Sequence, residues 1–233
     1  MNLFCFPHAG ASATIYSRWK SGLSAGIKMA SFDLPGRGAR MNAPLCYCMH
    51  DVVEDIYEQI KNFEIRRGYI LFGHSMGAIV SFELAKRILR ETGYPAKHIF
   101  FSGSNPPNVP SKHLEIYNAE DRIFIEEIRK MGGTNEDFFE NKELMQIFLP
   151  IIRADYQILE TYQPNECPLD IKCDLTVMYG TEDNTIDLQN IGCYSRLTSK
   201  SINVRTFTGN HFYINQHKNT VIEMINKAAE EYI

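Results

Sequence analysis

Ser75 lies in a pattern that could make it a nucleophile. It is the centre of the pentapeptide GHSMG (residues 73–77), which follows an apolar run, residues 69–72, of the length and composition of a buried strand. Apolar residues then recur at helical spacing up to Arg90. Between a strand and a helix, a G-x-S-x-G pattern predicts a nucleophile elbow, a sharp and strained turn whose crowding favours glycine at both ends of the pentapeptide. A glycine-rich turn with a bystander serine is the alternative, because about one chain in ten of this length carries the pattern by chance.

A serine nucleophile needs two further side chains. An imidazole must take its proton, and a carboxylate must orient that imidazole. Asp183 and His211 each follow a short apolar run that is typical of a strand. The chain order Ser75, Asp183, His211, each just past a strand, is the order that α/β hydrolases use. Glu182 and Asp187 lie close by, and either is an alternative to Asp183 as the acid.

Strands and helices alternate around these residues. Such alternation predicts a mostly parallel sheet with helices on both faces, and ligands of such sheets bind at the carboxyl ends of the strands. We therefore expect a single α/β domain over residues 1–233. The predicted strands are residues 3–6, 28–33, 69–72, 98–102, 175–179 and 203–207, and the predicted helices of this layered part are residues 14–23, 49–63, 78–90 and 220–232.

Residues 108–165 interrupt the alternation. Two amphipathic helices are predicted in succession, at about residues 119–131 and 138–162, with Pro150 as a break or kink in the second. A helical insertion after a strand of the sheet favours a lid over an apolar cleft. The alternative is a set of extra helices that pack against the core.

The composition argues against several classes of function. The net charge of −4, without a dense Lys/Arg face, argues against nucleic-acid binding. No apolar run approaches the roughly eighteen residues of a membrane span, and the first residues lack the features of a signal peptide, so we expect a cytoplasmic protein. The six cysteines are expected to be free thiols, and Cys46-x-Cys48-x-His50 does not have the spacing of a zinc site.

Six stretches together give the chain a specific resemblance. They are FCFPHAGASA (4–13), FDLPGRG (32–38), FGHSMGA (72–78), FLPIIRADY (148–156), YGTED (179–183) and GNHFYI (209–214). The chain resembles type II thioesterases, the stand-alone editing hydrolases that accompany nonribosomal peptide and polyketide synthases. The resemblance implies an α/β-hydrolase fold with a mobile helical lid. It also implies hydrolysis of acyl groups from the phosphopantetheine thiol of acyl or peptidyl carrier domains. Because the triad mechanism requires neither, we expect no cofactor and no metal, and we expect a monomer.

Matched position by position, the resemblance also assigns roles. It implies that Ser75 is the nucleophile, Asp183 the acid and His211 the base, and that the backbone N–H groups of Ala9 and Met76 form the oxyanion hole.

The chain departs from the family pattern at two places that flank the site. The family usually has Gly-Gly where this chain has Gly10-Ala11, and Gly-Gly-His where it has Gly209-Asn210-His211. Both departures replace a glycine in a loop beside the site, so they bear on loop geometry rather than on the roles of the residues.

Other functions stay open at this point. A general esterase or lipase and a medium-chain fatty-acyl thioesterase are alternatives within the same chemistry, and a catalytically silent module that docks on synthases is an alternative outside it. Because carrier domains are typically acidic and this chain is net negative, docking calls for a local basic patch. Arg37 and Arg40 are the candidates, and the alternative is that both are solvated or pair with local acids.

Overall fold

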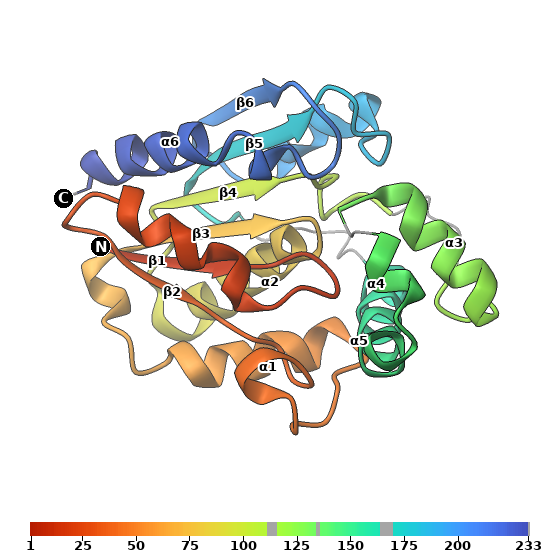
Figure 1. Ribbon diagram of the computed structural model, residues 1–233. Helices are drawn as coiled ribbons and strands as arrows, with labels where there is room; N and C mark the ends of the chain where they lie inside the picture. Colours follow the sequence, from red (N-terminus) through yellow and green to blue (C-terminus); the bar gives the residue numbers. More distant parts are fainter. Residues whose placement is uncertain (111–115, 134–135, 164–169, 233) are drawn as a thin grey trace.

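The core of the molecule is a parallel β-sheet (Figure 1). The computed structural model describes residues 1–110, 116–133, 136–163 and 170–232. The strand order is β2-β1-β3-β4-β5-β6, and every neighbouring pair is parallel, which confirms the predicted α/β class. The strands are β1 (Asn2–Phe6), β2 (Lys28–Ser31), β3 (Tyr69–His74), β4 (His98–Ser102), β5 (Asp174–Gly180) and β6 (Ile202–Phe207).

Helices cover both faces of this sheet. On one face lie α1 (Met49–Ile60) and α2 (Met76–Thr92), and on the other lie α6 (Lys218–Glu230) and the 3₁₀ segment η1 (Ala13–Gly22). Each face has its own apolar core, because the strands are buried on both sides and supply alternate residues to each cluster. The remaining 3₁₀ segments are η2 (Gly38–Arg40), η3 (Ile65–Arg67), η4 (Leu188–Arg196) and η5 (Tyr213–Asn215).

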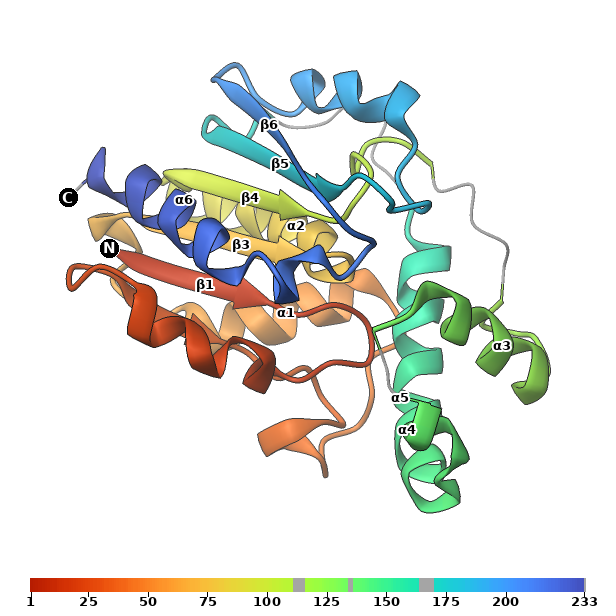
Figure 2. The same cartoon turned by 45° about the horizontal axis from the view of Figure 1, so that its top comes forward.

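The helical insertion lies between β4 and β5. It contains α3 (Asp121–Met131), α4 (Glu136–Glu140) and α5 (Lys142–Thr161), and these helices lie beyond the carboxyl ends of the strands in both views (Figures 1 and 2). Of the predicted break or kink at Pro150, the break is wrong, because α5 runs through this residue. The chain instead breaks at Asn141, whose side chain caps α5 by accepting a hydrogen bond from the Leu144 N–H at 3.0 Å. Pro150 is exposed, so water can satisfy the helix carbonyl that it leaves unpaired.

Close approach of backbone atoms shapes the turn between β3 and α2. A Cβ added at Gly73 would overlap the backbone of Gly77 and Ala78, and one added at Gly77 would overlap the carbonyl group of Phe6 at the end of β1. The predicted crowding is therefore present at both glycines, and it joins the first turn of α2 to two neighbouring strands.

The described residues show two further features. No helix among them combines the length and the apolar character needed to cross a bilayer. Five of the six cysteines are free thiols, as predicted, and Cys167 lies outside the described ranges.

The crowding at Gly77 can be tested by adding one methyl group. We expect Gly77→Ala to lower the free energy of unfolding by about 3 kcal/mol or more, because rigid backbone must move. Gly192→Ala is the control, since a Cβ there would have no atom within 4 Å, and it should change stability by less than about 1 kcal/mol. Urea denaturation of both variants measures the difference, and equal effects would contradict the steric account of the turn.

Candidate active site

Ser75 occupies the turn that joins β3 to α2. Its φ of 55° and ψ of −118° lie in a region that side-chain-bearing residues rarely adopt. The Ser75 N–H donates a hydrogen bond to the Ser102 carbonyl at the end of β4, at 2.7 Å. The side chain is half-buried rather than enclosed. This is the strained and accessible geometry that the pentapeptide predicts.

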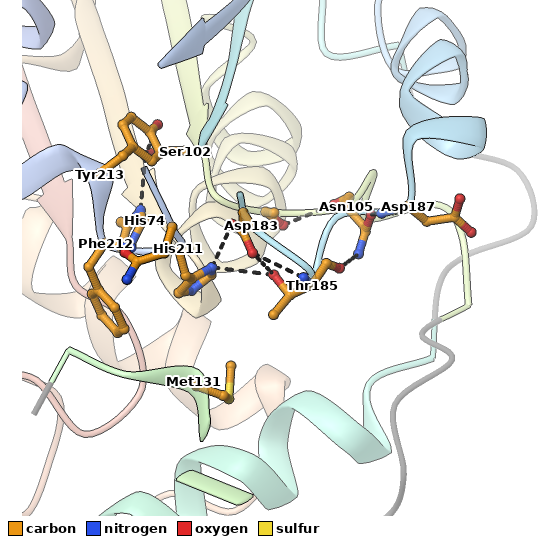
Figure 3. A network of polar contacts seen from close by, with 12 residues as sticks. His74, Ser102, Asn105, Met131, Asp183, Thr185, Asp187, His211, Phe212 and Tyr213 are labelled. Carbon is orange, nitrogen blue, oxygen red and sulfur yellow. Dashed lines mark hydrogen bonds and ion pairs between the residues drawn. The ribbon is translucent and has the colours of Figure 1, made fainter. Parts of the chain in front are cut away.

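Asp183 and His211 lie in direct contact, although 28 residues separate them in the chain. His211 Nδ1 lies 2.8 Å from Asp183 Oδ2, and both side chains are buried (Figure 3). The other carboxylate oxygen, Oδ1, accepts hydrogen bonds from the Thr185 hydroxyl at 2.6 Å and the Thr185 N–H at 3.0 Å. The carboxylate is therefore fixed on both sides, with one oxygen directed at the imidazole.

These contacts keep Asp183 ionised. Burial alone would raise the pKa of Asp183, but the hydrogen bond and charge of His211 and the two hydrogen bonds from Thr185 hold that pKa below its ordinary value of 3.8. The neighbouring acids have other places. Glu182 is exposed, and Asp187 caps η4 by accepting a hydrogen bond from the Gln189 N–H at 3.1 Å.

The Thr185 segment is held in turn by Asn105. Its side-chain amide donates to the Thr185 carbonyl at 2.8 Å, and its side-chain oxygen accepts from the Asp187 N–H at 2.8 Å (Figure 3). The loops after β4 and β5 are thus joined directly behind Asp183.

His211 lies beside the turn that holds Ser75. Its ring centroid is 5.0 Å from that of His74, the residue before Ser75. A Cβ added at Gly103 would lie 2.8 Å from His74 Cε1 and 3.3 Å from His211 Cε1, so glycine permits this approach. Among the hydrogen bonds of the described residues there is none between the Ser75 hydroxyl and His211, and such contacts are often longer in unliganded enzymes.

A buried polar network supports the turn from below. The Ser102 hydroxyl lies 2.9 Å from His74 Nδ1 and 2.6 Å from the Tyr213 hydroxyl (Figure 3). Burial, reinforced by the charges of His211 and His8, holds the pKa of His74 well below 6.5. Burial likewise lowers the pKa of His8 to about 4. Both histidines are therefore neutral at neutral pH and add no charge beside His211.

Two backbone N–H groups are available near Ser75. Met76 is the first residue of α2, where N–H groups have no partner within the helix, and Ala9 lies in the loop after β1. Over the described ranges neither N–H donates to another protein atom. Because Gly77 touches the Phe6 carbonyl group, this loop begins against the first turn of α2.

The arginines that the sequence suggests for docking have other roles. Arg37 is only 3% exposed and forms a two-fold ion pair with the buried Asp155 of α5, so the prediction that it presents charge to a partner is wrong. Arg40 forms a two-fold pair with Asp55 and is partly buried. Both arginines therefore pair with acids, but the acid that pairs with Arg37 is 118 residues away in the chain, whereas the acid that pairs with Arg40 is 15 residues away.

An apolar groove borders α5. It lies between that helix and the loop after β2, and its lining includes Met41, Leu45, Tyr47, Ile147 and Pro150.

The described part of the chain contains no group of three or more His, Cys, Asp or Glu side chains placed to hold a metal ion.

Sequence reasoning missed several supporting residues, Asn105 among them. Three had usable signals: Ser102 is a polar residue at the carboxyl end of an otherwise apolar strand, Asp155 is a lone carboxylate on the apolar face of a helix, and Thr185 follows an acid by two residues, the spacing of an Asx turn. Tyr213 carries no signal that separates it from an ordinary core aromatic.

Comparison with known proteins identifies the family. The model of the thioesterase domain matches residues 1–229. The chain belongs to the thioesterase family. Among its relatives, the linear gramicidin dehydrogenase LgrE of Brevibacillus parabrevis is 32% identical over 99% of this chain and 88% of its own length. The name of LgrE includes the word dehydrogenase. This chain, however, contains no G-x-G-x-x-G motif, the pattern typical of dinucleotide-binding proteins. The medium-chain S-acyl fatty acid synthase thioesterase of Anas platyrhynchos is 30% identical over 98% of this chain and 92% of its own length.

Solved thioesterase-family structures share the fold. ClbQ from the colibactin NRPS/PKS pathway is 35% identical and superimposes with a TM-score of 0.94 over 99% of this chain and 97% of ClbQ. BorB, the type II thioesterase of the borrelidin biosynthetic cluster, is 28% identical, with a TM-score of 0.86 over 97% of this chain and 91% of BorB. The expected α/β-hydrolase fold and the expected resemblance to type II thioesterases are both confirmed.

Thr185 offers a test of how the carboxylate is held in this thioesterase. Thr185→Val removes the hydroxyl and should lower the free energy of unfolding at pH 7 by about 1–3 kcal/mol, because an ionised buried oxygen loses a donor. The folded-state pKa of Asp183 is below its ordinary value of 3.8, so the stability it provides is complete above that pH and is lost as the pH falls through the folded-state value.

The penalty of Thr185→Val should therefore shrink in acid. Thr185→Ser keeps the hydroxyl and is the control, expected to change little at any pH. Urea titrations at pH 7 and at the lowest pH where all three proteins fold measure the effect. A penalty that does not vary with pH would contradict a hydrogen bond to the ionised carboxylate.

Proposed function

We propose that this chain is a type II thioesterase that hydrolyses acyl groups from the phosphopantetheine thiol of carrier domains. The observation that carries the proposal is the buried His211–Asp183 pair beside the strained turn of Ser75, in a chain of the thioesterase family. The similarity to ClbQ of an NRPS/PKS pathway and to BorB, a type II thioesterase of a biosynthetic cluster, supports the choice of carrier-bound substrates.

In the proposed mechanism, Ser75 is the nucleophile and His211 the general base. His211 Nε2 takes the hydroxyl proton as Ser75 Oγ attacks the thioester carbonyl, while Nδ1–H donates to Asp183, the acid of the triad. The carbon–sulfur bond then breaks, and the thiolate leaves with the proton held by His211. A water molecule, deprotonated by His211, attacks the acyl-serine and releases the carboxylic acid.

The backbone N–H groups of Ala9 and Met76 are the proposed oxyanion hole. Their lack of other acceptors among the described residues leaves both free to bind the developing oxyanion. The N-terminus of α2 adds a positive field at the same place, because the peptide dipoles of that helix align toward it.

The insertion of residues 108–165 is the proposed lid. Its helices lie beyond the carboxyl ends of the strands, on the side of the sheet where Ser75, Asp183 and His211 lie (Figure 2). Backbone of the insertion also meets the site directly, since a Cβ at Gly133 would overlap the Phe212 ring next to His211. A lid in this position would shield the acyl-serine from bulk water.

Carrier domains of synthases are the proposed partners, and we place the protein in the cytoplasm as a monomer without cofactor, nucleic acid or membrane. A medium-chain fatty-acyl thioesterase is the second candidate, favoured by the 30% identity to the avian fatty acid synthase thioesterase. The assembled His211–Asp183 pair disfavours a silent docking module.

Substrate comparison tests the function. We expect a higher kcat/KM on short acyl groups loaded on a carrier domain than on medium-chain acyl-CoA or p-nitrophenyl esters, because remote contacts with the carrier contribute to transition-state binding. Ser75→Ala should lower turnover at least about a thousandfold and abolish labelling by a fluorophosphonate probe. Equal rates on all three substrates would identify a general esterase, and preference for medium-chain acyl-CoA would favour the second candidate.

The assignment of the acid is tested by matched amide substitutions. Asp183→Asn should lower kcat about tenfold or more, since it leaves His211 without a partner for the reactive tautomer. Glu182→Gln alters an exposed neighbour and should leave kcat within about twofold of the wild type. A larger loss with Glu182→Gln or with Asp187→Asn would show that the acid has been misassigned.

A further inference from the structure

Asp155 is a carboxylate in an apolar setting. It is 0% exposed and lies on the inner face of α5 with Ile151, Ala154 and Ile158. Burial of a charge is costly unless that charge is paired and hydrogen-bonded. The partners of Asp155 therefore account for its presence on this face of the helix.

Three segments of the chain meet at Asp155. Arg37, from the loop after β2, donates through both terminal nitrogens, with Nη2 2.6 Å from Oδ1. The Gly10 N–H, from the loop after β1, donates to Oδ2 at 2.7 Å. Through one side chain, α5 is bonded to both loops.

The contact at Gly10 fixes the peptide next to a proposed oxyanion donor. The peptide unit between Ala9 and Gly10 is held at both ends, because its N–H donates to Asp155 and its C=O accepts from His8 Nδ1 at 3.0 Å. Gly10 has a φ of +76°, and a Cβ there would lie 2.8 Å from Cγ1 of Ile152 on α5. Helix and loop are therefore in contact at two positions of α5 that lie three residues apart, the apolar Ile152 and the polar Asp155.

We infer that Asp155, oriented by Arg37, is a positioning residue that fixes the loop after β1 so that the Ala9 N–H faces the Ser75 hydroxyl. The inference rests on the proposed function, because it assigns a cause to the geometry of the proposed oxyanion hole. It makes α5 a part of the catalytic machinery, acting through the loop rather than by touching the substrate.

A purely stabilising role fits the contacts less well. Buried ion pairs contribute little net stability compared with apolar side chains of similar size. The Arg37 Nε is also buried without a partner among the described residues, which adds a cost. Preorganised donors, in contrast, are worth two to three orders of magnitude in rate, so an anchor that fixes one of them has a large effect on catalysis.

The decisive variant replaces the ion pair by apolar residues. Arg37→Met with Asp155→Leu keeps the volume filled but removes the acceptor of the Gly10 N–H, and such replacements often leave folding intact. On a small acyl thioester we expect kcat to fall about tenfold or more with KM within about threefold. The inhibition constant of an alkyl boronic acid, whose serine adduct places an oxygen in the oxyanion hole, should rise by the same factor as kcat falls.

Two matched controls separate positioning from stability. Arg40→Met with Asp55→Leu removes another ion pair that has two hydrogen bonds but does not contact Gly10. This double variant should keep kcat within about twofold of the wild type. Arg37→Gln with Asp155→Asn removes both charges but keeps a side-chain oxygen for Gly10, and should recover most of the lost kcat. If the Gln/Asn double variant has as low a kcat as the Met/Leu double variant, loss of the hydrogen bond to Gly10 is not the cause of the lower kcat, and the inference fails.

If the Met/Leu double variant does not fold, an ester in place of the Ala9–Gly10 amide removes the Gly10 N–H without changing any side chain. It can be introduced by ligating a synthetic segment of residues 1–45 to Cys46, and should give the same loss of kcat. Unchanged kcat in a folded Met/Leu or ester variant would overturn the inference. A wild-type enzyme inactive on all thioesters would instead overturn the proposed function, and the rate of Ser75 labelling by a fluorophosphonate would still compare the variants.

Discussion

The close contact between Gly77 and the end of β1 is the constraint on which the site depends. Because no side chain separates α2 from the Phe6 carbonyl, the first turn of the helix lies directly against the strand that leads to Ala9. The same turn, closed against itself at Gly73, forces the positive φ of Ser75. These two close contacts therefore place Ser75, the proposed nucleophile, and bring the loop of Ala9 against the first turn of α2, which begins at Met76.

Polar groups around this corner are arranged so that charge appears only where the chemistry uses it. His8 and His74 are held neutral by burial, although both rings lie near His211. Asp183 stays ionised despite burial, because His211 and Thr185 supply its hydrogen bonds. In the proposed mechanism, an imidazolium formed at His211 would therefore meet the negative charge of Asp183 and no positive charge from either of these two histidines.

The sequence predicts the secondary-structure elements of the molecule better than the long-range polar contacts between them. The alternation of strands and helices, the elbow at Ser75 and the strand-end positions of Asp183 and His211 follow from periodicity and local turn chemistry, which act over short distances along the chain. The pairing of Arg37 with Asp155 joins residues 118 apart, and nothing in either local sequence reveals the other. An arginine in a Gly-rich loop therefore suggests an exposed charge, whereas the fold buries it.

The same long-range contacts determine which part of the insertion can move. Asp155 and Ile152 hold α5 against the loops after β1 and β2, so moving this helix away would break an ion pair, a hydrogen bond and an apolar contact together. The contacts of α3 with α5 combine burial and exposure. Phe124 of α3 is 0% exposed and meets Tyr156 of α5 edge to face, with ring centroids 5.4 Å apart. Arg153 of α5 lies over the Phe124 ring and pairs with the exposed Asp121 at 2.7 Å, and an exposed pair contributes little by itself. If the insertion opens to admit an acylated arm, displacing α3 would expose Phe124, whereas displacing α5 would break a buried ion pair and release the loop that carries Ala9.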